Sequence, residues 1–109
     1  MHHPLQITIR DIDPSENINL HIRERVEKLD ELFDKIQRCH VIVELAQKNQ
    51  SQGKIYNVRI DLKVPRNELA INRIHDENVY VALHKAFDAA RRKLLVHLSK
   101  QRGEEDWIH

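Results

Sequence analysis

The sequence predicts an α+β domain in which two helices lie side by side on one face of a four-stranded sheet. Two long segments carry apolar residues at intervals of three and four, and four shorter segments alternate apolar and polar residues. The order along the chain is β-α-β-β-β-α. Both apolar helix stripes need cover, and one face of a sheet is the simplest cover. The 109 residues leave room for one compact domain.

The first strand and the first helix occupy the N-terminal third of the chain. Apolar and polar residues alternate from Leu5 to Ile9, as a half-buried strand requires. Asp13 is predicted to cap a helix, with Pro14 in the first helical position and Glu16 in a capping box. The helix is expected to run to about Lys35. Its apolar stripe consists of Ile18, Ile22, Val26, Leu29, Phe33 and Ile36.

Three further strands follow in the middle of the chain. Residues 39–45 alternate, and the polar stretch Gln47 to Lys54 is predicted to be a turn. The next strand runs from Tyr56 to Val64 and is closed by Pro65, which cannot donate to the sheet. Residues 69–74 form a short fourth strand. The outer face of this sheet, with Arg10, Arg59, Asp61 and Lys63, is mixed in sign and is expected to be solvated.

The last segment reads as a long amphipathic helix. Asp76 is its predicted cap and Gly103 its predicted end. Its apolar residues are Val79, Leu83, Ala86, Phe87, Ala90, Leu94 and Leu98. We therefore divide the chain into a domain over residues 1–102 and a short acidic tail over residues 103–109.

Cysteine usage and hydropathy favour the cytoplasm. The single cysteine, Cys39, cannot form an internal disulfide, whereas secreted domains usually carry an even set. No signal peptide is recognised at the N-terminus, and no apolar run approaches the roughly 20 residues of a membrane-spanning helix. We expect no membrane association.

The charges are sorted along the helices although they nearly cancel. Lys and Arg number 18 against 17 Asp and Glu, which gives a formal charge of +1. Four cations of the last helix fall on one flank, here called the basic stripe: Lys85, Arg92, Lys93 and Lys100, with Ala89 and Val96 between them. Arg25, Lys28 and Lys35 lie on one edge of the first helix, and Glu27, Asp30, Glu31 and Asp34 lie on its outward face. Cations clustered within a Debye length of roughly 8 Å attract a polyanion together, even on a neutral protein.

An alternative interpretation of these cations is a solvated surface with ion pairs inside each helix. Lys28, for instance, has Glu24 and Glu31 at pairing distance along the helix. The basic stripe fits this alternative less well, because up to the predicted helix end at Gly103 it has one acid at matching spacing, Asp88 beside Arg92.

The sequence resembles the ribosome hibernation-promoting factor and ribosome-associated inhibitor family, also known as sigma-54 modulation proteins. The resemblance covers nearly the whole chain and lies in scattered positions, above all in segments 28–36 (KLDELFDKI) and 76–83 (DENVYVAL) before the Arg/Lys-rich last helix. It implies a fold like that of double-stranded-RNA-binding domains. It further implies a protein that occupies the tRNA and mRNA channel of the small ribosomal subunit and silences translation during stress or stationary phase.

The resemblance also assigns residues. Arg25, Lys28, Arg92 and Lys100 match basic positions of the family and are the expected rRNA contacts; Lys85 and Lys93 extend the same stripe by geometry. Ala89 and Val96 stand where several relatives carry lysine, which thins the stripe. The chain resembles the short form of the family, without the C-terminal dimerisation domain, so that pairing of ribosomes would need a second factor.

No catalytic constellation is found, and we expect neither an enzyme nor a cofactor, a metal or a small-molecule substrate. With Gly53 and Gly103 as its two glycines, the chain has no Gly-rich phosphate loop. The eight histidines lack metal-ligand spacing, and His84 and His97 are expected on the helix surface. Cys39 is expected to be inert in the core. The competing function is a protein-interaction module that modulates a sigma-54-type transcription factor through the sheet edge or the acidic face of the first helix.

Overall fold

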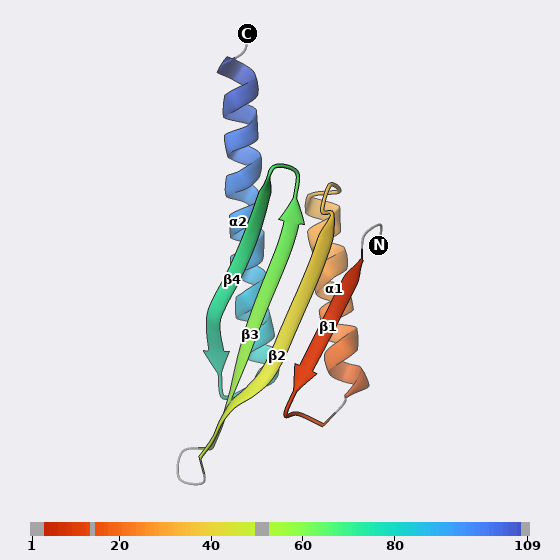
Figure 1. The fold of residues 1–109 in the computed structure, drawn as a ribbon, viewed down its shortest axis with the longest axis vertical. Helices are drawn as coiled ribbons and strands as arrows, with labels where there is room; N and C mark the ends of the chain where they lie inside the picture. The colour runs from red at the N-terminus through yellow and green to blue at the C-terminus, as the bar shows by residue number, and fades with distance from the viewer. Residues whose placement is uncertain (1–3, 14, 50–52, 108–109) are drawn as a thin grey trace.

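The computed structural model describes residues 4–13, 15–49 and 53–107, and the side chains outside 47–49 and 102–107. Its elements follow the predicted order (Figure 1). They are β1 (Leu5–Arg10), α1 (Glu16–Leu32), β2 (Arg38–Asn49), β3 (Gly53–Val64), β4 (Asn67–Asp76) and α2 (Val79–Trp107).

The four strands form one sheet in the order β1-β2-β3-β4. β1 pairs parallel with β2, and the other neighbours pair antiparallel. Val41 lies opposite both Ile7 of β1 and Ile60 of β3, so that the apolar positions of adjacent strands share one face. Both helices cover that face (Figure 1), and the predicted fold class is confirmed.

The core lies between this sheet face and the two helices. α1 contributes Ile22 and Val26, both with no exposed surface, and α2 contributes Leu94 in the same state. Ring contacts join the helices at both ends: His21 to Tyr80 with centroids 4.8 Å apart, and Phe33 to His97 at 5.9 Å. Early residues of α1 thus meet early residues of α2, so the two helices run in the same direction.

The first helix is shorter than predicted at both ends. It begins at Glu16 after Ser15, so the prediction that it starts at Asp13 with Pro14 in the first turn is wrong; Pro14 itself lies outside the described residues. It ends at Leu32 because Phe33 already has an extended backbone, with φ −147° and ψ 106°. Phe33 and Ile36 nevertheless stay buried, which explains why their spacing imitated one more helical turn.

The strands of the sheet are longer than their apolar residues suggested. β2 continues to Asn49 and β3 begins at Gly53, with Lys48 opposite Lys54 in the ladder. Most of the predicted turn is therefore strand, because backbone hydrogen bonds extend a hairpin without apolar side chains. β3 ends before Pro65 as predicted, and the reversal into β4 uses Arg66 at φ 67°.

The last helix begins and ends later than predicted. Its cap is Asn78, whose Oδ1 accepts hydrogen bonds from the backbone N–H groups of Tyr80 (2.8 Å) and Val81 (3.3 Å). The predicted cap, Asp76, is the last residue of β4 and accepts from the N–H of Asn78 at 3.0 Å. Gly103 does not end the helix, which continues to Trp107. A glycine inside a helix costs only about 1 kcal/mol relative to alanine, too little to stop a helix of this length. Within the described residues, no helix is both long and apolar enough to cross a membrane.

Candidate RNA-binding surface

The flank of α2 that faces β4 carries most of the basic stripe. Two contacts fix this orientation: Lys85 Nζ lies 2.8 Å from Asp76 Oδ2, and Lys93 Nζ donates to the carbonyl oxygen of Ala70 at 2.6 Å. Residues three and four apart share a helix face, so Ala89, Val96 and Lys100 follow on the same flank. The stripe thus runs along the junction between α2 and the outer strand of the sheet.

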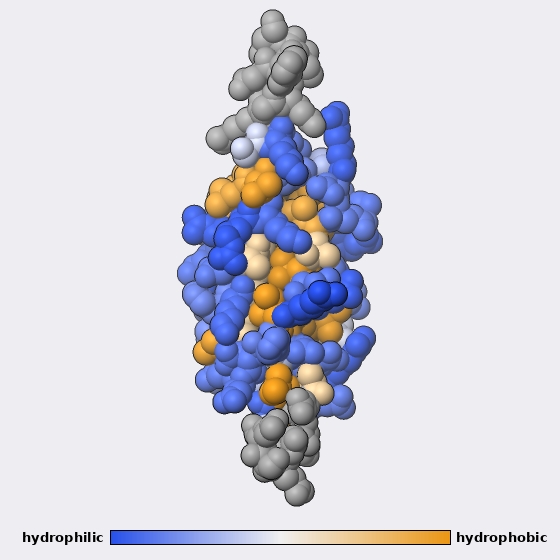
Figure 2. Space-filling view, turned by 90° about the vertical axis from the view of Figure 1, so that its left-hand side faces the viewer, coloured by the Kyte–Doolittle hydropathy of each residue, from blue (hydrophilic) through white to orange (hydrophobic). Residues whose placement is uncertain are grey.

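A groove of about 470 Å³ opens at this junction. Its lining combines an apolar floor with three cations: Asn67, Leu69, Ala89, Arg92, Lys93, Val96, His97 and Lys100. Figure 2 looks onto the side of the molecule formed by α2 and β4, where hydrophobic surface interrupts the hydrophilic residues around it. Among the side chains that the structure describes, no Asp or Glu lines the groove, which makes it suited to anionic ligands.

Arg92 and Lys100 are the available cations of the stripe. Both are exposed, and neither forms an ion pair within the described part of the chain. Asp88, the acid nearest to Arg92 along the helix, lies 3.6 Å from His84 Nε2 instead. Within the described side chains, the guanidinium of Arg92 and the ammonium group of Lys100 are therefore not held by a carboxylate and can contact phosphate.

Lys85 differs from the other cations because it already has an acidic partner. The hydrogen bond from Lys85 and that from the N–H of Asn78 hold the pKa of Asp76 below its ordinary value of 3.8. Helical spacing did not reveal this partner, since Asp76 lies nine residues earlier at the end of a strand. Lys85 has no acid four residues away along the helix, as predicted, but the fold pairs its charge with that of Asp76.

The two predicted contacts on α1 lie on the flank that faces α2. His21 contacts Tyr80 of α2, and Arg25 and Lys28 follow His21 at helical spacings of four and seven. Arg25 is half-buried and Lys28 is exposed. No ion pair joins Lys28 to Glu24 or Glu31 among the described side chains, so the structure does not favour the alternative of pairing within this helix.

Arg91 is a further exposed cation of α2, which the sequence did not single out. It follows Tyr80 by eleven residues, which is three helical turns, and so shares the α1-facing flank of α2. On the helical wheel it falls beside the apolar stripe and was not counted with Arg92. Once the position of α1 is known, Arg91 joins Arg25 and Lys28 along one seam.

The two histidines near the stripe behave differently from each other. His84 is exposed, as predicted. His97 was expected on the surface and is buried, with 8% of its surface exposed, because its ring packs edge-on against Phe33. The Nε2 atom of His97 is inaccessible and has no hydrogen-bond partner among the described residues.

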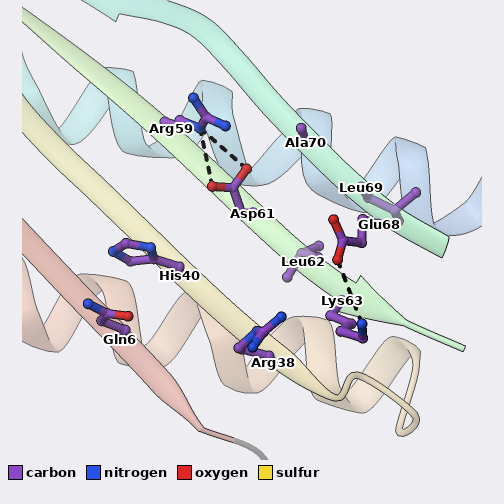
Figure 3. A pocket seen from close by; sticks show the side chains of 10 residues that line it. All are labelled: Gln6, Arg38, His40, Arg59, Asp61, Leu62, Lys63, Glu68, Leu69 and Ala70. Carbon is purple, nitrogen blue, oxygen red and sulfur yellow. Dashed lines mark hydrogen bonds and ion pairs between the residues drawn. The ribbon is translucent and has the colours of Figure 1, made fainter.

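The open face of the sheet offers a less basic surface. A depression of about 450 Å³ contains two ion pairs, Arg59 with Asp61 at 3.2 Å and Lys63 with Glu68 at 3.7 Å (Figure 3). Both cations therefore have acidic neighbours on the same face. The prediction of a surface of mixed sign is confirmed, and the α2 groove is the better anion site.

Cys39 has no role in a reactive site. The side chain is fully buried, as predicted, and burial together with the negative charges of Asp30 and Asp61 raises the pKa of its thiol to about 12. The thiol is therefore protonated and unreactive at neutral pH. Among the described residues, no three His, Cys, Asp or Glu side chains gather as a metal site would require.

Comparison with known proteins identifies the family of the chain. The family model for sigma 54 modulation protein / S30EA ribosomal protein matches residues 5–102. The chain belongs to this family. The match confirms the resemblance seen in the sequence, and the family's description names a ribosomal protein and no enzyme. No match is found among curated proteins.

Two solved structures show the same fold as this S30EA family member. The N-terminal domain of Protein Y from Thermus thermophilus is 18% identical, with a TM-score of 0.65, over 85% of this chain and 92% of that chain. A ribosomal subunit interface protein from Coxiella burnetii is 20% identical, with a TM-score of 0.60, over 92% and 98%. At these identities the likeness establishes the fold, and the binding residues must be argued from this chain's own surface.

Proposed function

We propose that this protein binds the small ribosomal subunit in the channel of tRNA and mRNA and silences ribosomes during stress or stationary phase. The observation that carries the proposal is the S30EA family match over residues 5–102, on a fold whose helical side presents Arg92 and Lys100 without an ion pair among the described side chains. A protein bound to ribosomes in this way acts in the cytoplasm.

Inhibition would come from occupancy, with no chemical step. The contacts to rRNA phosphates are assigned to Arg25, Lys28, Lys85, Arg92, Lys93 and Lys100, with Arg91 added from the structure. Phosphate contacts position a protein without reading base sequence, and structured RNA is recognised largely by its shape. Specificity would then lie in the fit of the helical side to the channel.

The ribosome is a better-supported partner than a sigma factor. One structural relative is described as a ribosomal subunit interface protein, and the family description includes a ribosomal protein beside the sigma 54 modulator. The surfaces proposed for a sigma factor are the sheet edge and the acidic face of α1, where Glu27 and Glu31 are exposed. A contact made there would leave the cations of α2 unused.

The test is sedimentation of the purified protein with small ribosomal subunits on a sucrose gradient. We expect co-sedimentation with free subunits, competition by tRNA, and steep weakening as salt rises, because each phosphate contact releases counterions. Protein that stays at the top of the gradient at low salt would refute the proposal. Binding that resists salt would instead indicate a protein partner.

Pairing of two ribosomes is a separate question for the same gradient. We propose that this chain silences single ribosomes and that pairing needs a second factor. Purified protein added to whole ribosomes should therefore produce no dimer peak, and a dimer peak would refute this part of the proposal.

A further inference from the structure

The α2 groove has properties that phosphate binding alone does not explain. Its floor is formed by Leu69, Ala89 and Val96, and Val96 keeps 53% of its surface exposed. Exposed apolar surface is costly next to charged groups, since water must solvate it. A groove that bound only phosphate would gain from lysine at these positions.

The rim of the groove complements a ligand that is negative at one end and flat and apolar at the other. Arg92 and Lys100 form no ion pair among the described side chains, and the ammonium group of Lys93 is held by the carbonyl oxygen of Ala70. The volume of about 470 Å³ lies in the range of roughly 300–1,000 Å³ that is typical of small-ligand sites. An unstacked nucleotide has this combination of phosphate and base.

His97 lines the groove but offers no polar contact there. Its side chain is 8% exposed, and its Nε2 atom is inaccessible and has no partner among the described residues. Charge recognition in the groove is therefore assigned to Arg92 and Lys100.

We propose that this groove holds one unstacked nucleotide of a single-stranded RNA segment. The base lies on the floor of Leu69, Ala89 and Val96, and the adjoining phosphate lies between Arg92 and Lys100. The inference rests on the proposed ribosome contact and deepens it, since it assigns a binding site for one base within a surface that otherwise suits phosphates. The apolar positions that thin the basic stripe then become part of the binding site.

The test uses the RNA trinucleotide ApApA as probe and the backbone amide NMR signals of the 13.0 kDa protein as readout. We expect saturable shifts at Leu69, Ala89 and Val96. Inorganic phosphate and the acidic tripeptide Glu-Leu-Glu serve as the competing ligands. Equal shifts of the floor residues with phosphate, or tighter binding of the peptide, would overturn the proposal.

Two matched variants on α2 separate a base seat from simple charge attraction. Val96 lines the groove, whereas its neighbour Leu95, 42% exposed, does not. Val96→Lys should weaken ApApA binding about fivefold, because the base loses apolar contact area on the floor of the groove. Leu95→Lys adds the same charge and should cause no loss. If both variants bind ApApA as tightly as the unmodified protein or more tightly, the groove does not bind a base.

The outcome for the ribosome is measured separately. Co-sedimentation of the unmodified protein with small subunits, combined with no ApApA binding, would refute the nucleotide seat and leave the proposed function intact. Specific ApApA binding without co-sedimentation would refute the ribosomal function and leave the seat.

Discussion

The two halves of the part of α2 whose side chains are described, residues 79–90 and 91–101, carry similar residues but differ in what their cations can reach. In the first half, Asn78 caps the helix and Asp76 holds Lys85 at 2.8 Å. In the second half, Arg92 and Lys100 have no ion pair within the described residues and border an open groove. The first half therefore anchors the helix to the sheet, and the second half presents charge. Cations that lie on the same flank of one helix can thus differ in their capacity to bind an anionic ligand.

The largest expected effect is the loss of ribosome binding when the second half is reversed in charge. Arg92→Glu with Lys100→Glu should abolish co-sedimentation with small subunits, because two free cations become repulsive toward phosphate. Both side chains are exposed, so the melting temperature should hardly change.

The matched control is Arg10→Glu with Arg38→Glu. These two residues are exposed and have no ion pair among the described residues. They belong to the sheet, whose open face points away from the helices. The control therefore changes the net charge by the same amount at a different place. Ribosome binding should survive in this control. Equal loss in both double variants would mean that net charge matters and the location of the cations does not.

A smaller effect should separate the two halves directly. Arg92→Gln should reduce the affinity for small subunits about tenfold, since a hydrogen bond to a charged group is worth roughly 1.5–3 kcal/mol. Lys85→Gln should reduce it less than about twofold, because Lys85 is already neutralised by Asp76. The affinities of the two variants for small subunits are measured at one salt concentration. Equal losses of affinity would show that the two halves do not differ in binding.

The anchoring role of the first half predicts a change in stability without a change in binding. Asn78→Ala removes the side chain that accepts from Tyr80 and Val81, and should lower the free energy of unfolding by about 1 kcal/mol in urea denaturation. Asn72→Ala, at an exposed position of β4, is the control and should cost little. Ribosome affinity should stay unchanged in both, and a loss in Asn78→Ala would place binding in the first half as well.

The smallest effect concerns the pH dependence of the Asp76 interaction. Because the pKa of Asp76 is lower in the folded protein, its stabilising effect is complete above the unfolded value of 3.8 and is lost as the pH falls through the folded pKa. Asp76→Asn should therefore be slightly less stable than the unmodified protein at pH 7, and the difference in melting temperature should vanish in more acidic solution. If the difference in melting temperature persists in acid, it results from packing and not from the charge of Asp76.

Much of the fold followed from patterns that are local in the chain. Alternation such as that in residues 39–45 and the three-and-four spacing of the helices predicted the element order and the core face, and segments 28–36 and 76–83 indicated the family. The ends of the elements were less accurate. Phe33 kept helical spacing after the helix had ended, and the polar residues 47–49 extended a strand through backbone bonds alone.

The candidate site was predicted less completely, because its properties depend on residues far apart in the sequence. Helical periodicity correctly predicted that Arg92 and Lys100 lie on one exposed flank of α2. It could not show the ion pair of Lys85, the burial of His97 against Phe33 or the position of Arg91 on the seam with α1.

The sequence by itself determined which residues are apolar, which are charged and on which face of its own helix or strand each one lies, since these follow from the periodicity of the backbone. Only the tertiary structure decided which cations remain free. That outcome depends on what packs across from each helix face: β4 brings Asp76 to Lys85 and Leu69 to Val96, and α1 brings Phe33 to His97. A near-neutral chain thereby presents an apolar floor bordered by cations.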